Sequence, residues 1–367
     1  MKKGRLSSLD AFRGITIAGM ILVNNPGSWK HVYAPLQHAE WHGWTPTDLV
    51  FPFFLFIVGA SVSLALSKRM ARGDSLPSLY FKIFSRSLIL FALGIFLRLL
   101  FRFDFENLRI PGVLQRIAIC YLLSALIFTK VGTRGRLVIF LFILMAYYLI
   151  LKFVPVPGYG PGVMAFEGNL CGYIDVKLLG GHLYKPTFDP EGILSTFPAI
   201  ATTLIGTLTG DWLRSSKKVL QKTTGLFIAG IVMIGSGLLL HPHFPINKQL
   251  WTSTFVLFTS GAALVLLGLC FLLMDGIGFK KWAYPFLVLG TNAIFVYAGS
   301  IVMAKLLVLI KVSTGQGTLT LQAFIYKNLL VPLFGNLNGS LLFALLFILL
   351  WIAGMIPFYR NRIFIKI

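Results

Sequence analysis

The sequence predicts an all-α polytopic membrane protein, and two observations carry that prediction. First, 56% of the 367 residues are apolar and only 12% are charged, about half of the roughly 25% that is usual in a soluble domain, and the mean hydropathy is +0.81. Second, the apolar residues gather in stretches of about 20, the length at which a helix crosses a bilayer core of about 30 Å. This composition excludes a soluble globular enzyme, a disordered chain and a coiled coil.

Ten stretches have the length and composition of a transmembrane helix. One further stretch, 321–335, is shorter and more polar, which predicts a re-entrant or interfacial helix; an eleventh span is the alternative. The longest loop, 155–190, is rich in glycine, proline and aromatic residues, so we expect it to be ordered. No soluble domain or strong repeat divides the chain, and 1–367 is therefore predicted to be a single transmembrane domain. The ten predicted spans are 7–25, 47–67, 81–101, 111–129, 136–154, 191–209, 223–240, 252–274, 284–310 and 339–359.

The loop charges predict the orientation of this bundle. With the N-terminus in the cytoplasm, the inner segments hold 18 Lys and Arg and the longer outer segments hold 8. This is the positive-inside pattern, and it favours ten spans with both termini cytoplasmic, because an eleventh span would place the basic tail outside. The net charge of +21 is then a topology signal. We expect the lipid bilayer, and no nucleic acid, as a partner.

The outer loop between the first two spans is the most distinctive polar segment. It holds His31, His38 and His42 among several tryptophans, with no matching cysteine or carboxylate cluster, so we expect no metal. A histidine general base is better supported, because imidazole titrates near neutral pH. The tryptophans favour a sugar-like or planar partner, although an interfacial aromatic belt alone would explain them.

Polar residues inside the spans are the other functional candidates, because they are expensive in lipid. Asp10 and Arg13 share a helix face near the inner end of the first span, where a structural ion pair is the alternative. Asn24 and Asn25 lie at its outer end, where a helix cap or a turn is the alternative. The remaining candidates are Arg86, Arg98, Gln115, Arg116, Asn292 and Lys305.

Two of these positions have specific interpretations. Arginine suits the recognition of phosphate or carboxylate, so Arg116 is a candidate anion-binding group; a buried ion pair with Asp10 or Asp48 is the alternative. Asn292 follows a glycine in a span that also contains proline, which predicts an irregular helix there. From these residues alone, a transporter and a membrane transferase remain equally open.

The sequence of the first seventy residues favours the transferase over the transporter, because it resembles a known family. Residues 5–27 read RLSSLDAFRGITIAGMILVNNPG, and LQHAEWHGWTPTDLVFPFFLFIVGASVSL begins at Leu36. These blocks closely resemble the membrane-embedded heparan-alpha-glucosaminide N-acetyltransferase family and its bacterial homologues, which transfer acetyl from acetyl-CoA to a terminal amino sugar. Lysosomal members carry an additional N-terminal luminal segment and helix, and we expect this chain to be a bacterial inner-membrane homologue without them. Further blocks similar to the family are RIPGVLQRIAICY at 109–121, DPEGILSTFPAIATTLIGTLTG at 189–210, NKQLWTSTFVL at 247–257 and PFLVLGTNAIFVY at 285–297.

The resemblance implies catalytic roles for three residues. His38 matches the family's active-site histidine, Asn24 its active-site asparagine, and Asp48 its DLVFP block. It implies acetyl-CoA as donor and an amino sugar or glycan on the outer side as acceptor, through an amine or a hydroxyl, and it is compatible with a homodimer. His38 acts either as a general base for direct transfer, with Asn24 on the developing oxyanion and Asp48 orienting the imidazole, or as a nucleophile that forms an acetyl-histidine.

The donor's anionic end requires basic or polar groups within or at the ends of the spans. We expect acetyl-CoA to enter from the cytoplasm and its phosphates to lie near arginine. A sugar or amino-sugar transporter is the competing interpretation of the whole chain. The predicted donor-binding residues are Asp10, Arg13, Arg86, Gln115, Arg116 and Asn292.

Overall fold

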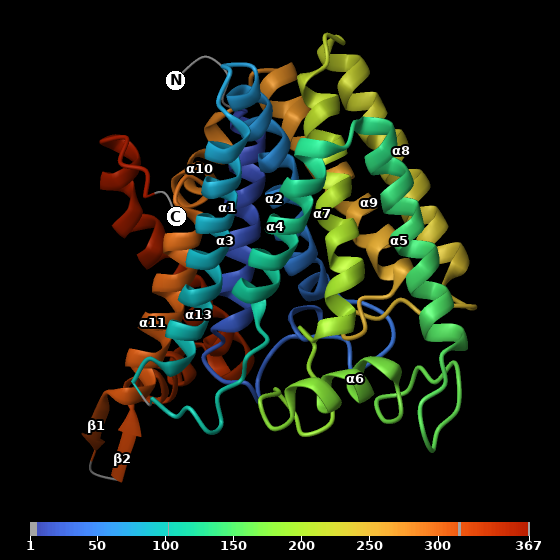
Figure 1. Cartoon of the computed structure of the whole chain (residues 1–367). Coiled ribbons are helices and arrows are strands. Elements are labelled where there is room, and N and C mark those ends of the chain that lie inside the picture. The colour runs from blue at the N-terminus through green and yellow to red at the C-terminus, as the bar shows by residue number, and fades with distance from the viewer. Residues whose placement is uncertain (1–5, 102, 315–316, 366–367) are drawn as a thin grey trace. The chain divides into compact units, whose positions relative to one another are not determined.

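The computed structural model describes residues 6–101, 103–314 and 317–365, and its regular structure is mostly helical (Figure 1). The chain divides into two compact units, and segments of the two alternate along the sequence, so no single cut separates them. Helix α2 begins in one unit and continues in the other. Unit 1 comprises Met1–His38, Thr45–Val50 and Leu273–Ile367, and unit 2 comprises Ala39–Trp44 and Phe51–Leu272.

Unit 1 is built around the first helix and the last third of the chain. Its elements are α1 (Ser7–Asn24), the 3-10 turn Ala34–Leu36, the first turn of α2 (Pro46–Met70), the π turn Leu272–Gly276 from its second residue, the 3-10 turn Lys281–Ala283, α10 (Tyr284–Gly290), α11 (Ala293–Leu309), β1 (Lys311–Thr314), β2 (Gly317–Thr320), α12 (Leu321–Phe324), the π-helical turn Ile325–Leu330 and α13 (Val331–Arg360).

Close packing of α1 against α10 organises the centre of unit 1. A Cβ atom on Gly14 would lie 1.8 Å from the Phe286 carbonyl oxygen, and one on Gly290 would lie 2.0 Å from the Asp10 carbonyl oxygen. Glycine at both positions therefore lets the two backbones touch, as is common between membrane helices. The first turn of α1 is thus held against the C-terminal end of α10.

Unit 2 holds the remaining helices. A Cβ atom on Gly59 would lie 1.9 Å from the Thr203 carbonyl oxygen, so α2 and α7 also meet at backbone contact. The other elements of unit 2 are α3 (Leu76–Leu99), α4 (Val113–Lys130), α5 (Thr133–Phe153), α6 (Leu170–Leu179), α7 (Ile193–Arg214), α8 (Val219–Leu240) and α9 (Ser253–Phe271).

Each of the ten predicted spans coincides with helix. Among the described residues, eight helices are long and apolar enough to cross a membrane, or up to nine if the bent pair Lys281–Gly290 and Ala293–Leu309 counts as one span. Helix α1 is not among the eight, because Asp10, Arg13 and Asn24 lower its mean hydropathy. The multi-pass helical class is therefore confirmed, while the count of ten and the cytoplasmic termini stay predictions.

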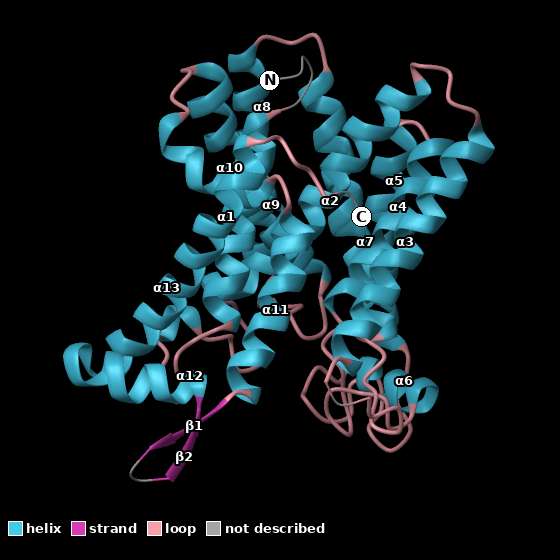
Figure 2. Ribbon diagram, turned by 90° about the vertical axis from the view of Figure 1, so that its left-hand side faces the viewer, coloured by secondary structure: helices cyan, strands magenta, loops and turns pink. Residues whose placement is uncertain are grey.

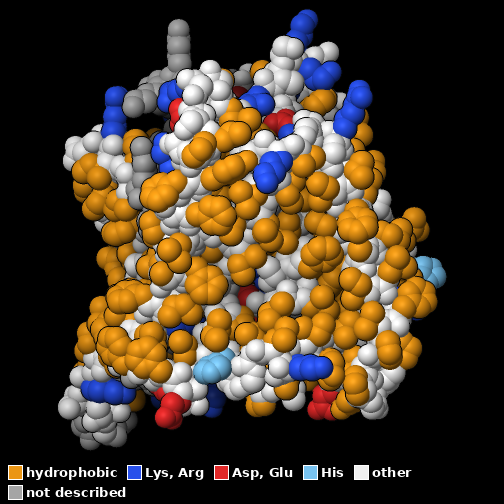
Figure 3. All heavy atoms as spheres, viewed as in Figure 1, with side chains coloured by type: hydrophobic (Ala, Val, Ile, Leu, Met, Phe, Trp, Pro, Cys, Tyr) orange, Lys and Arg blue, Asp and Glu red, His pale blue; other side chains and the backbone are white. Residues whose placement is uncertain are grey.

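The surface of unit 2 fits a lipid environment. Exposed apolar side chains line α5, including Val138, Phe142 and Met145, and α3 presents Phe81 and Leu88 in the same way. The space-filling view shows such side chains spread over the face that these helices form (Figure 3). A contiguous apolar surface of this kind marks contact with lipid or with another protein, and in a multi-pass protein lipid is its ordinary neighbour.

Two expectations need correction or refinement. The predicted span 284–310 is broken, because α10 and α11 meet at an angle of 71° beside Asn292, as the glycine and proline there suggested. The prediction of an all-α fold is wrong at one hairpin, where β1 pairs antiparallel with β2 (Figure 2). Its β-branched residues Val312, Thr318 and Thr320 favour strands, a signal hidden in a loop that reads as polar.

The stretch 321–335 is helical and continues into α13. Together they form the helical segment Leu321–Arg360, interrupted at Gly335, whose φ of 74° is a left-handed conformation that glycine adopts easily. The α12 end of this segment runs across the direction of the later turns of α13 (Figure 2). An interfacial or re-entrant position for it stays a prediction.

Candidate active site

A histidine–carboxylate pair lies between the end of α1 and the start of α2. The Nδ1 atom of His38 is 2.7 Å from Oδ1 of Asp48. The Asp48 side chain is 1% exposed, whereas the His38 side chain is 45% exposed. A buried carboxylate therefore holds one edge of an imidazole that is itself partly exposed. The structure brings together these two residues, which the sequence proposed as partners.

The first turn of α2 fixes the carboxylate. Asp48 is the third residue of the helix that begins at Pro46, and its Oδ2 accepts the backbone N–H of Thr45 at 3.0 Å. This is half of a capping box, in which an acidic side chain satisfies the amide that precedes the helix. The Thr45 hydroxyl donates to the Gln37 carbonyl at 2.6 Å, which fastens the residue before His38 to the same turn.

This arrangement assigns the histidine tautomer. Ionised carboxylate oxygens only accept hydrogen bonds, so Nδ1 of His38 carries the proton and donates it to Asp48. The lone pair of the neutral ring is then on Nε2, the nitrogen away from the carboxylate. An imidazole oriented in this way is suited to accept a proton at Nε2, because the carboxylate stabilises the imidazolium that results.

The two adjacent asparagines at the end of α1 have different environments. Asn25 is buried and its Nδ2 donates to the Ile21 carbonyl at 2.8 Å, which caps the helix. Asn24 is exposed, and its side chain makes no hydrogen bond with the described residues. The cap interpretation therefore applies to Asn25. Asn24 keeps an amide available to a ligand, although no contact joins it to His38 or Asp48 in the described part of the chain.

Three predicted donor-binding residues lie at the opposite end of α1 in unit 1. The Arg13 Nη1 atom donates to Oδ1 of Asp10 at 2.8 Å and to the Gly290 carbonyl at 3.3 Å. Asp10 and Arg13 therefore form an ion pair, as the alternative interpretation expected. Asn292 uses both ends of its amide on the C-terminal segment: Nδ2 donates to the Ile363 carbonyl at 3.0 Å, and Oδ1 accepts from the backbone N–H of Ile365 at 2.8 Å. These contacts hold the described C-terminal residues near the first turn of α1.

The other three predicted donor-binding residues lie in unit 2. Arg116 is fully buried: its guanidinium donates to the Ser195 hydroxyl at 2.5 Å and lies 5.0 Å above the ring of Trp251. Among the described residues its hydrogen-bonding partners are hydroxyl and carbonyl oxygens of α7 and the residue before it, and the alternative of a buried ion pair stays a prediction. Gln115 is also buried. Arg86 is exposed and lies 5.0 Å over the Tyr121 ring, which leaves its guanidinium accessible.

Comparison with known proteins places these features in a family. The family described as heparan-alpha-glucosaminide N-acetyltransferase, catalytic, matches residues 5–241, which contain His38, Asp48 and Asn24. The chain belongs to this family. Curated relatives that carry the same name include a Homo sapiens protein, 32% identical over 351 aligned residues that cover 80% of this chain and 52% of the relative, and a Mus musculus protein, 30% identical with coverage of 80% and 53%.

The chain spans about half the length of the curated relatives it matches. Family membership supports the acetyltransferase keywords proposed from the sequence blocks, and it does not favour the transporter interpretation. Four of those blocks lie wholly inside the matched region, and two of them, 109–121 and 189–210, are far apart in the sequence.

The structure joins these two family blocks through an ion pair that the sequence reasoning missed. Arg109 grips Asp189 with two hydrogen bonds, Nε to Oδ2 at 2.8 Å and Nη2 to Oδ1 at 2.6 Å, and it also contacts Glu191. Burial alone would lower the pKa of Arg109, but the hydrogen bonds and charges of the two carboxylates raise it. The sequence did hold a signal for this ion pair, because a basic residue precedes one predicted span and acidic residues precede another.

The tryptophan-rich part of the loop is held within unit 2. The Trp41 indole donates to the Met164 carbonyl at 2.7 Å, and His42 Nδ1 lies 3.3 Å from Nδ2 of Asn247. Burial, followed by the charge of His241, lowers the pKa of His42. The neutral form of His42 is therefore favoured, and its ring has a structural partner. Trp41 and His42 anchor residues 39–44, which connect His38 to Thr45 along the chain.

Proposed function

We propose that this protein is a transmembrane acetyltransferase that moves the acetyl group of acetyl-CoA to an amino sugar or glycan. The observation that supports it is the 2.7 Å contact between His38 Nδ1 and Asp48 Oδ1, inside the region matched by a family of N-acetyltransferases. The human and mouse relatives are named heparan-alpha-glucosaminide N-acetyltransferase, so a glucosamine-type amine is the first acceptor to test.

His38 would act as the general base in this reaction. Its Nε2 takes a proton from the acceptor amine as the amine nitrogen attacks the thioester carbonyl, which forms the C–N bond. The C–S bond then breaks, and the proton on His38 neutralises the leaving thiolate of CoA. Asp48 stabilises the transient imidazolium through Nδ1, and general-base catalysis of this kind contributes about 10²–10⁴-fold.

Asn24 is the proposed oxyanion donor. Its exposed side-chain amide has no partner in the described residues, and a hydrogen bond to the thioester oxygen would strengthen as that oxygen gains negative charge. Removing a single donor of this type costs about 10²–10³-fold in kcat in a well-studied protease. An Asn24→Ala variant that retained wild-type kcat would exclude this role.

The donor site is proposed at the predicted cytoplasmic side. Arg86 of unit 2 is exposed, and Arg13 of unit 1 is partly exposed while it also pairs with Asp10, so each guanidinium is a separate candidate for the donor's phosphates. Arg116, Gln115, Asn292 and Asp10 make structural contacts instead, so we assign them no direct contact with the donor. With a periplasmic acceptor, the protein would carry the acetyl group across the bacterial inner membrane.

Acceptor-dependent release of CoA thiol from the purified full chain tests the function. With glucosamine as acceptor, we expect His38→Ala to lower kcat by about 10²–10⁴-fold while acetyl-CoA binding is retained. His243→Ala is the matched control, because His243 is an exposed histidine in another loop. Wild-type turnover in His38→Ala would end the assignment. Uptake of glucosamine into vesicles without acetyl-CoA, and without thiol release, would favour the transporter.

The acetyl-histidine route requires a separate measurement. Radiolabelled acetyl-CoA is mixed with the protein in the absence of acceptor, and the protein is then separated from the donor. Direct transfer predicts no label on the protein. A stable label that disappears in His38→Ala would instead establish His38 as the nucleophile.

A further inference from the structure

The chain segment that follows α1 is fastened to the C-terminal helices of unit 1. The Gln322 side chain of α12 donates to the Pro26 carbonyl at 3.0 Å. The backbone N–H of Gly27 donates to the carbonyl of Ser340 in α13 at 3.1 Å. The Ser340 hydroxyl accepts from the Ser28 backbone N–H at 3.0 Å and donates to the Ser28 carbonyl at 3.1 Å. One side chain therefore satisfies both polar groups of the Ser28 backbone, although it lies 312 positions later in the chain.

Gly27 lies against these helices without room for a side chain. A Cβ atom there would lie 2.8 Å from Cδ2 of Tyr326, 3.0 Å from Cβ of Phe343 and 3.0 Å from Cα of Ser340. Glycine therefore lets the segment approach α13 closely, as small residues do between membrane helices. The Ser340 residue is only 1% exposed, so little water competes for the hydrogen bonds of its hydroxyl.

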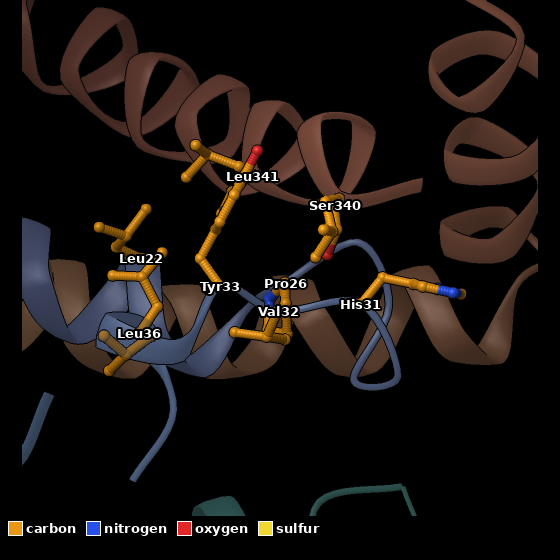
Figure 4. Close-up of a pocket in the computed structure, with 11 residues that line it drawn as sticks. Leu22, Pro26, His31, Val32, Tyr33, Leu36, Ser340 and Leu341 are labelled. Atoms are coloured by element: carbon orange, nitrogen blue, oxygen red, sulfur yellow. The ribbon is translucent and has the colours of Figure 1, made fainter. Parts of the chain in front are cut away.

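The same helices hold the next residues of the segment. The Tyr326 hydroxyl lies 3.1 Å from Nδ1 of His31, and the Tyr33 hydroxyl donates to Oδ1 of Asn338. Figure 4 shows the Ser340 side chain between α13 and the chain segment that carries His31. Residues 26–33 are therefore held at several points by residues that lie at least 295 positions later. The residues that make these contacts form a C-terminal platform: Gln322, Tyr326, Asn338 and Ser340.

The platform fixes the backbone that follows the proposed oxyanion donor. Asn24 is the last residue of α1, and its side chain is exposed. The next residue, Asn25, is buried and caps α1, and the platform then holds residues 26–28. The main chain on both sides of Asn24 is therefore held while its amide stays accessible. Such a group must be placed to within about 0.5 Å, and a misplacement of about 1 Å can cost 10²-fold in rate.

We propose that Ser340 is a positioning residue for the proposed acetyl transfer, which it supports by holding the segment that places the Asn24 amide. The inference rests on the proposed function and adds to it a role for α12 and α13, which lie outside the matched residues 5–241. Ser340 does not contact the substrate in this role, because its buried hydroxyl uses its proton on the Ser28 carbonyl. It acts through the backbone that leads back to Asn24.

Two substitutions in the full chain test this role. Ser340→Ala removes both hydrogen bonds to Ser28, and we expect it to lower kcat with glucosamine by about 10-fold, the combined value of two neutral hydrogen bonds. Gln322→Ala removes one contact from the other helix and should lower kcat by about 3-fold. The KM for acetyl-CoA should stay unchanged in both variants. Ser300→Ala is the matched control, because Ser300 is 3% exposed and its hydroxyl bonds within its own helix at 2.7 Å; its kcat should equal that of the wild type.

A double-mutant cycle separates positioning from a general effect on folding. If Ser340 acts through Asn24, Ser340→Ala lowers kcat in the wild type and causes no further loss in Asn24→Ala. Losses that multiply in the double variant would overturn the inference. A folded Ser340→Ala protein, judged by its melting curve, with the kcat of the wild type would overturn it as well.

Hydrogen exchange separates this inference from the proposed function. Exchange of the backbone amides of residues 25–33 is measured by mass spectrometry on the full chain without substrate. We expect faster exchange in this segment for Ser340→Ala and Gln322→Ala, and no change for Ser300→Ala. This result supports the platform even if no acetyl transfer is found, in which case only the proposed function fails. Acetyl transfer with unchanged exchange and unchanged kcat in both variants would overturn the inference and leave the proposed function intact.

Discussion

Replacing Asp48 by asparagine tests the central contact of the proposed site without removing the helix cap. The asparagine oxygen can still accept the Thr45 backbone N–H, as Oδ2 of Asp48 does at 3.0 Å. The asparagine NH2 group would face Nδ1 of His38 in place of a carboxylate oxygen. Because an NH2 group only donates, His38 would move its proton to Nε2 and lose the lone pair that accepts the substrate proton.

The expected magnitude follows from the geometry of this contact. A hydrogen bond to a charged group contributes about 1.5–3 kcal/mol, which corresponds to roughly 10- to 150-fold in rate. The carboxylate is 1% exposed, which favours the upper part of this range, whereas the imidazole is 45% exposed, so water can replace part of the lost interaction. We therefore expect Asp48→Asn to lower kcat by about 10²-fold, with a KM for acetyl-CoA close to that of the wild type.

A double-mutant cycle makes the assay specific. Steady-state CoA release is measured for Asp48→Asn, His38→Ala and the double variant, with melting temperatures as the control for folding. If Asp48 acts through His38, the double variant is no slower than His38→Ala alone. The reasoning is refuted if Asp48→Asn retains wild-type kcat. It is refuted equally if the two losses multiply in the double variant.

Three further predictions concern stability and are measured as melting temperatures of the purified protein. Arg109→Lys should lose the two-pronged contact with its buried carboxylate and about 1–3 kcal/mol, so an unchanged melting temperature would contradict the importance of that grip. Gly290→Ala should cost at least about 1–3 kcal/mol, because its Cβ would lie 2.0 Å from the Asp10 carbonyl oxygen; Gly354→Ala, which has open space, is the control. Burial raises the pKa of Asp175 from 3.8 to about 7, so the folded state binds this proton more tightly than the unfolded chain, and the free energy of unfolding should fall as pH rises between those values. Asp175→Asn should flatten that pH dependence, and an equally steep decline in the variant would exclude Asp175 as its source.

The sequence predicted the helices well because the signal for a membrane span is local. Each of the ten predicted stretches coincides with helix, since composition over about 20 residues is enough to identify such a segment. The break beside Asn292 was also indicated by Gly290 and by Pro285 in the same predicted span. The hairpin Lys311–Thr320 was missed because a pair of four-residue strands at the end of a span gives only a weak signal.

The candidate site was partly predictable for a similar reason. His38 and Asp48 are only ten positions apart, and both lie in blocks that resemble the family, so their pairing could be anticipated. The sequence could not predict which asparagine caps α1. Asn24 and Asn25 are chemically identical, and only the fold shows that Asn25 is buried. For Arg116 the sequence suggested carboxylate partners, whereas the described contacts are with hydroxyl and carbonyl oxygens.

The membrane class, the helical segments, the family and the candidate histidine and carboxylate could all be predicted from the sequence. Tertiary structure alone decided the contacts between distant positions: Arg109 with Asp189, 80 residues apart, and Ser28 with Ser340, 312 residues apart. The physical reason is that burial of apolar residues in lipid depends on each segment's own composition. A hydrogen bond between two segments depends instead on their relative placement in space. The composition of a single helix does not specify that placement.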